Sequence, residues 1–135
     1  MEEINEARPP KVDPKIRSSP RIRQLYWCDF PKDAELPEFW KRRPVVVVSF
    51  RNTLSGSVTV IPFTSQDQSK NKWAIEVKDT ITKGYRAWAV CDKPYTVAVS
   101  RLYPDRRPNT NTRLNEQEFN LILLKLLEWL PKIEI

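Results

Sequence analysis

The stretch from Val45 to Phe50 reads VVVVSF, and this run of β-branched residues constrains the fold more than any other part of the chain. β-Branched side chains pack well on a pleated sheet and lose rotamer freedom in a helix. A strand that is apolar at nearly every position is typical of strands buried on both faces. The run therefore predicts a buried strand inside a β-rich core.

Five other segments are also rich in apolar residues typical of strands, and turn residues bound them. Residues 54–57 form a turn after the valine run, so the next strand is expected to return as the second half of a hairpin. Further along, Trp73, Ile75 and Val77 alternate and would share one face. The strands are expected at residues 21–30, 45–50, 58–63, 73–77, 86–91 and 95–102. Six short strands at this spacing predict a mainly β domain, either a small barrel or two packed sheets.

The C-terminal part of the chain changes to a helical period. Asn115 is expected to cap a helix over residues 116–130, with the Glu118 carboxylate reaching back to the cap and Pro131 ending the helix. Apolar residues lie on nearly every side of this helix, so it must be covered on more than one side. The chain's own sheet can cover one side. The other side predicts a partner subunit, and hence a homodimer.

The composition indicates the cellular compartment and argues against zinc sites and disulfides. The chain has 135 residues, enough for one domain, and no apolar run approaches the roughly eighteen residues of a membrane span. Its first residues carry no apolar stretch, so no secretory signal is expected. There is no His, and Cys28 and Cys91 lie far apart, so neither a zinc site nor a disulfide scaffold is expected. These features favour a reduced cytoplasmic protein that contacts no membrane.

The same composition excludes several kinds of catalysis. Without His, the chain lacks the Ser-His and Cys-His nucleophile pairs and the commonest general base. With only Gly56 and Gly84, it cannot form the glycine-rich loops that bind nucleotides. The net charge of +6 favours a polyanionic partner such as nucleic acid. The densest excess lies in residues 83–113, which carry seven Lys and Arg against two Asp.

Residues 1–20 differ from the rest of the chain. They hold four prolines, and four acidic side chains balance four basic ones. Because such a segment buries too little apolar surface to order itself, we expect a flexible N-terminal arm over 1–20 and a single domain over 21–135.

Basic residues precede the valine strand, and hydroxyl residues follow the next strand. If these two strands form a hairpin, Arg43 and Thr64 lie at the same end of the sheet. A guanidinium beside hydroxyls and an amide is a good phosphate cradle, because its planar fork donates in two directions. The alternative interpretation is purely structural. Arg43 would lie in solvent at the start of one strand, and Thr64 would belong to an ordinary turn after the other. Short motifs of this kind are weakly specific.

Five sequence blocks, in this order and spacing, resemble the MazF/PemK family, the toxin members of bacterial type II toxin–antitoxin systems. The resemblance covers about residues 21–130. The blocks are LYWCDF at 25–30, RPVVVVS at 43–49, VIPFTSQ at 60–66, AVCD at 89–92 and VSRL at 99–102, followed by NEQE at 115–118 at the start of the helix.

That resemblance implies a small SH3-like or CcdB-like β-barrel with a C-terminal helix, which acts as a homodimer without a metal or cofactor. It implies sequence-selective cleavage of single-stranded RNA such as mRNA, with neutralisation by a cognate antitoxin. The family's catalytic Arg falls on Arg43 and its catalytic Thr on Thr64. The ribose 2′-OH would attack the adjacent phosphorus and leave a 2′,3′-cyclic phosphate and a 5′-OH. Arg43 would stabilise the developing charge, and Thr64 would bond a non-bridging oxygen.

Further residues near these two are expected to contact RNA. The basic ones would lie along phosphates, and two polar ones directly follow Thr64. Trp40 would either stack on a base or pin its loop to the barrel. The RNA-binding residues are expected to be Trp40, Lys41, Arg42, Ser65, Gln66, Arg86 and Lys93.

The chain also departs from the family, and two other functions stay open. Arg23 and Gln24 stand where the family usually has Gly-Asp, and the loop over residues 32–43 is aromatic where the family's is Gly-rich, so substrate preference does not carry over. One alternative is a CcdB-like toxin, which shares the fold and poisons DNA gyrase. The other is a non-catalytic nucleic-acid-binding β-barrel module. The Arg43 and Thr64 motifs favour the nuclease.

Overall fold

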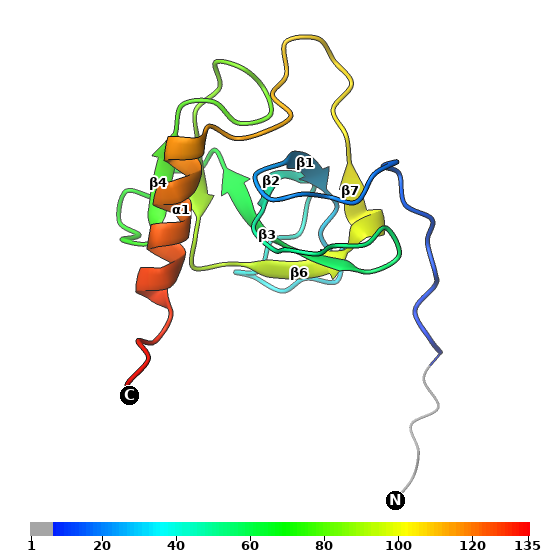
Figure 1. Ribbon diagram of the computed structural model, residues 1–135, viewed down its shortest axis with the longest axis horizontal. Helices are drawn as coiled ribbons and strands as arrows, with labels where there is room; N and C mark the ends of the chain where they lie inside the picture. Colours follow the sequence, from blue (N-terminus) through cyan, green and yellow to red (C-terminus); the bar gives the residue numbers. More distant parts are fainter. Residues whose placement is uncertain (1–6) are drawn as a thin grey trace, which may run out of the picture.

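The structure is a computed structural model that describes residues 7–135. A curled sheet carries one helix along one end, and the two ends of the described chain extend away from it (Figure 1). This confirms the expected mainly β class with a C-terminal helix. The elements are β1 (Leu25–Cys28), β2 (Arg43–Val47), β3 (Ser57–Thr64), β4 (Ala74–Val77), β5 (Ala87–Val90), β6 (Tyr95–Ala98), a 3-10 turn (Val99–Arg101), β7 (Leu102–Tyr103) and α1 (Glu116–Trp129).

The long strand β3 holds the sheet together. Its first half pairs with β6, its middle pairs with β2, and its last two residues pair with β5, always antiparallel. The strand order is β4-β5-β3-β2-β1-β7, with β6 branching from β3. No ladder within residues 7–135 closes this sheet, so the barrel is an open one.

Both faces of the valine strand are covered, as its sequence predicts. Val45 and Val47 pack in the barrel interior, in one cluster with Val60 and Val97. Val46 packs on the opposite face, in a second cluster that includes residues of α1. All three valines of β2 are fully buried, which explains why the strand is apolar without alternation.

The strand expected over residues 95–102 is divided in two. β6 pairs with β3. After it, the 3-10 turn Val99–Arg101 redirects the chain, and β7 pairs with β1. The pairing places Tyr103 opposite Trp27. A single continuous strand was therefore the wrong prediction here, because the chain changes its partner strand at this turn.

The helix begins at its expected cap, but one part of the predicted capping is wrong. The Asn115 side chain accepts hydrogen bonds from the backbone N–H groups of Gln117 and Glu118, at 2.8 and 3.2 Å. The Glu118 carboxylate does not reach back to the cap. It accepts instead from the backbone N–H of Lys78, at 2.9 Å, and so ties the helix to the end of β4.

The N-terminal segment touches the barrel before residue 21. Ile16 is buried in the interior cluster, and the Lys15 ammonium donates to the Ser100 carbonyl at 2.6 Å. The first six residues of the expected arm lie outside the described part of the chain. Packing against the domain therefore begins at or before Lys15, because Ile16 supplies an apolar anchor. No helix in the described range is long and apolar enough to cross a membrane.

Candidate functional site

The β2–β3 hairpin brings Arg43 and Thr64 together. Val45 pairs with Pro62, and the same antiparallel register places Arg43 opposite Thr64 at the end of the ladder. The Arg43 Nη1 atom donates to Thr64 Oγ1 at 3.4 Å. The sequence pattern predicted this juxtaposition, and the hairpin register is its physical cause.

The positive charge of Arg43 has no carboxylate partner within residues 7–135. Its guanidinium is half-buried and lies over the Phe39 ring, 4.5 Å from the centroid. Its Nε atom is fully buried and makes no hydrogen bond to the described residues. Burial lowers the pKa of Arg43 from its ordinary value, because desolvation disfavours the charged form. An anion bound here would compensate that desolvation.

The hydroxyl of Thr64 is arranged to donate. Its oxygen accepts from Arg43 and from the backbone N–H of Gln66, at 3.4 and 3.2 Å. A hydroxyl has two acceptor positions and one hydrogen, so both acceptor positions are in use. The hydrogen finds no acceptor among the described residues. Thr64 is only 4% exposed, so the residues packed around it restrict its side chain.

Both residues line a pocket of about 280 Å³. Four of the residues expected to contact RNA line it with them: Lys41, Arg42, Ser65 and Arg86. The structure adds seven lining residues that were not among the expected contacts: Trp27, Pro44, Phe63, Thr80, Thr82, Tyr85 and Ala87. The pocket therefore combines cations, hydroxyls and aromatic rings, which is the chemistry that a nucleotide requires.

The other two arginines of this pocket already have carboxylate partners. Arg42 Nε donates to Asp29 Oδ1 at 2.7 Å, and its guanidinium stacks on the Tyr103 ring at 4.1 Å. This hydrogen bond raises the pKa of Arg42 and lowers that of Asp29. Arg86 Nη1 lies 3.4 Å from Glu76 Oε1. Arg43 thus differs from both in having a charge that is not balanced.

Three of the expected RNA contacts lie outside this pocket. Trp40 is half-exposed and lines a neighbouring hollow of about 980 Å³, which shares Lys41 and Arg42 with the Arg43 pocket. The Lys93 ammonium donates to the Pro37 carbonyl at 3.3 Å and lies over the Phe39 ring. Gln66 contacts the Thr64 hydroxyl through its backbone N–H.

Phe39, and not Trp40, pins the loop before β2 to the barrel. Its ring packs against Phe30 and Tyr95, with centroids 5.9 and 6.0 Å away, and its backbone N–H donates to the Tyr95 hydroxyl at 3.1 Å. The loop is therefore held by one aromatic residue while the other stays accessible.

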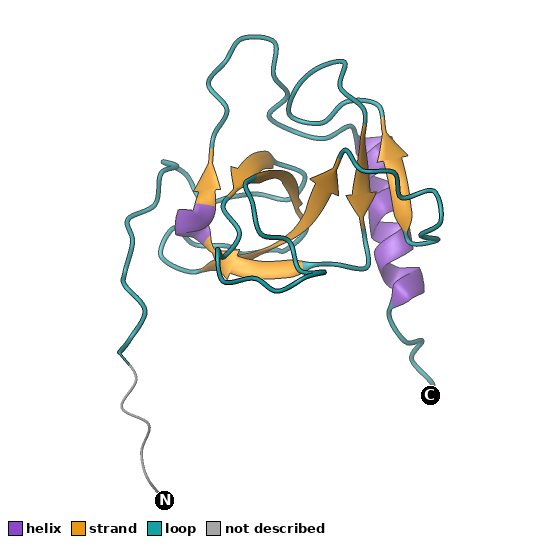
Figure 2. Ribbon diagram, turned by 180° about the vertical axis from the view of Figure 1, so that it is seen from behind, coloured by secondary structure: helices purple, strands orange, loops and turns teal. Residues whose placement is uncertain are grey.

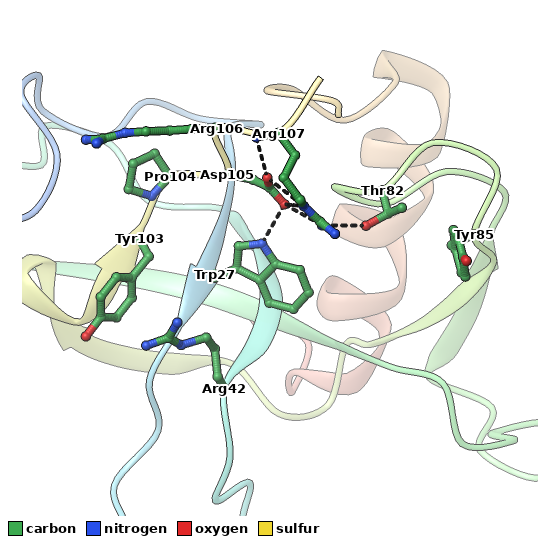
Figure 3. Close-up of a pocket in the computed structure, with 9 residues that line it drawn as sticks. All are labelled: Trp27, Arg42, Thr82, Tyr85, Tyr103, Pro104, Asp105, Arg106 and Arg107. Carbon is green, nitrogen blue, oxygen red and sulfur yellow. Dashed lines mark hydrogen bonds and ion pairs between the residues drawn. The ribbon is translucent and has the colours of Figure 1, made fainter. Parts of the chain in front are cut away.

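A second pocket, of about 610 Å³, adjoins the first and was not expected from the sequence (Figure 3). Asp105 lies at its back and accepts hydrogen bonds from Trp27 Nε1 and Arg107 Nη2, at 2.9 and 2.7 Å. Arg107 Nη2 also donates to Thr82 Oγ1 at 3.3 Å. Hydrogen bonding to Arg107, and secondarily to Trp27, holds the pKa of the Asp105 carboxyl well below its usual range. The network joins residues 78 positions apart, so no local pattern predicts it.

The cysteines are not nucleophiles at neutral pH. Cys28 and Cys91 are free and buried, and burial raises the pKa of each thiol to about 12. As for metal ligands, no three His, Cys, Asp or Glu side chains gather into a metal-binding group in the part of the chain that the structure describes.

Comparison with known structures shows the same fold in several toxins. MazF from Deinococcus radiodurans has 19% sequence identity and a TM-score of 0.65, and the match covers 83% of this chain and 96% of that one. The Mycobacterium tuberculosis toxin MazF-mt6 has 17% identity and a TM-score of 0.58, over 79% of this chain and 95% of that one. An endoribonuclease in complex with its cognate antitoxin, from a Mycobacterial species, has 17% identity and a TM-score of 0.58, over 85% and 100% of the two chains.

The family assignment comes from the sequence. No curated protein matches the chain significantly. Residues 21–130, however, match the family described as "PemK-like, MazF-like toxin of type II toxin-antitoxin system". That range includes the whole sheet and the helix, as well as Arg43 and Thr64. The chain therefore belongs to the PemK-like, MazF-like toxins of type II toxin–antitoxin systems.

Proposed function

We propose that this protein is a toxin endoribonuclease that cuts single-stranded RNA sequence-selectively and without a metal ion. The observation that carries the proposal is the Arg43–Thr64 pair, in which a half-buried, unpaired guanidinium lies beside a hydroxyl with a free hydrogen. The family supports this proposal, and one protein of the same fold is described as an endoribonuclease.

The proposed reaction relies on charge stabilisation and uses no histidine base, since the chain has none. The 2′ oxygen gives its proton to water and forms a bond to phosphorus, and the bond from phosphorus to the 5′ oxygen breaks. The leaving oxygen takes a proton from water, so the products are a 2′,3′-cyclic phosphate and a 5′-OH. Negative charge develops on the non-bridging oxygens, where Arg43 stabilises it and Thr64 donates a hydrogen bond. A fixed guanidinium supplies the positive charge that other nucleases take from a metal.

The RNA backbone would approach this pair along the cations at the same edge of the sheet. Lys41 and Arg86 line the pocket, and Lys93 lies beyond Phe39. Contacts of this kind are made to phosphates and weaken as salt rises. A cognate antitoxin would neutralise the toxin with a disordered acidic segment that folds over this basic edge and displaces RNA.

A homodimer is part of the proposal. The helix α1 lies along β4 at one end of the molecule, so the sheet covers only one of its sides (Figure 2). On the uncovered side Leu124 and Leu127 are 52% and 65% exposed, and Leu121 is 46% exposed. Apolar patches of this kind mark protein interfaces. Light scattering should give twice the 15.9 kDa of the chain, and a monomer at micromolar concentration would contradict the dimer.

The direct test of the function is cleavage of a long single-stranded RNA in EDTA. We expect discrete fragments that end in cyclic phosphate, because neither Arg43 nor Thr64 needs a metal. An absolute requirement for magnesium would refute the proposal. Inhibition of gyrase supercoiling by a preparation that leaves RNA intact would instead favour the CcdB-like alternative.

A further inference from the structure

We propose that the pocket around Trp27 and Arg107 holds one unpaired base of the RNA, beside the phosphate at Arg43. We further infer that it prefers guanine or uracil, which carry a carbonyl at position 6 or 4 of the ring, over adenine or cytosine, which carry an amino group at that position. The inference rests on the proposed function and adds the source of sequence selectivity to it.

The two pockets are continuous. Trp27, Arg42, Thr82 and Tyr85 line both of them. The β1–β2 register pairs Trp27 with Pro44, one residue after Arg43. A nucleotide whose phosphate lies at Arg43 would therefore have its base, or that of its neighbour, at the second pocket.

Aromatic rings form the walls of this second pocket. The Trp27 ring is held at its edge by the bond from Nε1 to Asp105, so its orientation is fixed (Figure 3). Tyr103 lies on one side of Trp27 and Tyr85 on the other, and Tyr85 is 68% exposed. Because the Arg42 guanidinium already lies over the Tyr103 ring, Trp27 and Tyr85 are the rings left for stacking. Base stacking on such rings provides affinity for single strands whatever the base.

Base selectivity would come from Arg107. Its Nε and Nη2 atoms are bonded to Asp105, which fixes the plane of the guanidinium. Its Nη1 atom makes no hydrogen bond to the described residues, so its two hydrogens are left to donate. Both Asp105 oxygens already accept, one from Arg107 and the other from Arg107 and Trp27. This cluster therefore offers donors and no free carboxylate acceptor. Guanine O6 and uracil O4 accept, whereas the amino groups of adenine and cytosine would face another donor.

Arg106 provides a matched control. It is the immediate neighbour of Arg107 and carries the same charge. Arg106 also lines the pocket, but its side chain extends away from the Trp27 ring (Figure 3). Replacing either arginine removes one positive charge, but only Arg107 is bound to Asp105.

The test uses labelled single-stranded octamers of 2′-fluoro RNA, which the protein cannot cut because the attacking hydroxyl is absent. At each position in turn, the octamer carries G, U, A or C, and affinity is measured by fluorescence anisotropy. At one position, the wild-type protein should bind G or U about tenfold more tightly than A or C. Arg107→Ala should abolish this preference, while Arg106→Ala should keep it and weaken all four octamers alike. Tyr85→Ala should weaken all four without changing their order.

Several outcomes would overturn the proposal. They are equal affinity for the four bases at every position, no measurable binding, a preference that persists in Arg107→Ala, or a preference lost equally in Arg106→Ala. Cleavage of ordinary RNA, measured in parallel, separates this proposal from the proposed function. A wild-type protein that shows the base preference but cuts no RNA would refute only the nuclease function. A nuclease without the preference would refute only the base subsite.

Discussion

Arg43 and Arg107 line adjacent pockets and differ in what balances their charge. Arg43 is half-buried and has no carboxylate partner within the described chain, and its Nε atom makes no hydrogen bond there. Arg107 is mostly exposed and is held by Asp105 through two nitrogens. The same side chain is thus unpaired in one pocket and paired in the next.

The two arginines therefore offer a ligand different things: Arg43 offers an unbalanced positive charge, and Arg107 offers hydrogen-bond donors with a fixed direction. An unpaired, partly desolvated guanidinium gains most from an incoming anion, because no existing ion pair has to be broken. A guanidinium already bound to a carboxylate gains less from a phosphate, but its remaining hydrogens point in a fixed direction. The first arrangement suits charge stabilisation in a reaction, and the second suits recognition of a base edge.

The largest expected effect comes from removing the unpaired charge. Arg43→Ala should lower RNA cleavage about 100-fold or more, as the loss of one strong donor to a developing oxyanion does. Arg43→Lys should recover part of the rate, because it restores the charge without the planar fork. The cleavage rates are compared with that of Arg51→Ala, which removes one charge in the turn beyond the other end of β2. Cleavage by Arg43→Ala within a few-fold of wild type would place the reaction elsewhere.

A smaller loss is expected from the hydroxyl beside Arg43. Thr64→Val keeps the buried shape and removes the donor, so cleavage should fall about tenfold to a hundredfold, the usual cost of a hydrogen bond to a charged group. Thr64→Ser keeps the donor and should retain most of the rate. The two variants are compared in the same cleavage assay, with thermal unfolding to check the fold. Equal rates for Val and Ser would show that the hydroxyl is not used.

The paired arginine gives an effect on stability that depends on pH. The pKa of Asp105 is lowered in the folded protein, so its contribution to the free energy of unfolding is fully present above the ordinary Asp pKa of about 4. That contribution is lost as the pH falls through the lower folded-state value. Urea unfolding should therefore show that the wild type loses more stability than Asp105→Asn between pH 7 and pH 3. Parallel losses in the two proteins would show that the ion pair does not stabilise the loop.

The smallest effect concerns the exposed cations around both pockets. Lys41→Ala should reduce the slope of log affinity against log salt by about one unit, because one phosphate contact is lost. All RNA sequences should weaken alike, since phosphates carry no sequence information. An unchanged slope would identify Lys41 as a solvated side chain without a phosphate contact.

The sequence predicted the features that depend on strands adjacent in the chain. The valine run marked the buried strand, and the antiparallel pairing of β2 with β3 brought Arg43 to Thr64, because the apolar pattern of two consecutive strands fixes their register. It did not predict the Asp105 network, since β7 has only two residues and the partner Trp27 lies 78 positions earlier in the chain. It also misplaced the Glu118 carboxylate, which a backbone N–H of Lys78 draws away from the helix cap. Local patterns therefore anticipated one pocket, and contacts between distant segments made the other.

One measurement tests most directly whether Arg43 acts in the reaction and Arg107 in base selection. Single-turnover cleavage rates are determined in EDTA with saturating protein, on RNAs that carry each of the four bases at the selective position. Arg43→Ala should lower the rate constant about 100-fold or more on every RNA. Arg107→Ala should stay within a few-fold of wild type on every RNA under these saturating conditions, and should lose the base preference when the protein is limiting. Wild-type rate constants from Arg43→Ala would contradict the central claim that its unpaired charge drives the reaction.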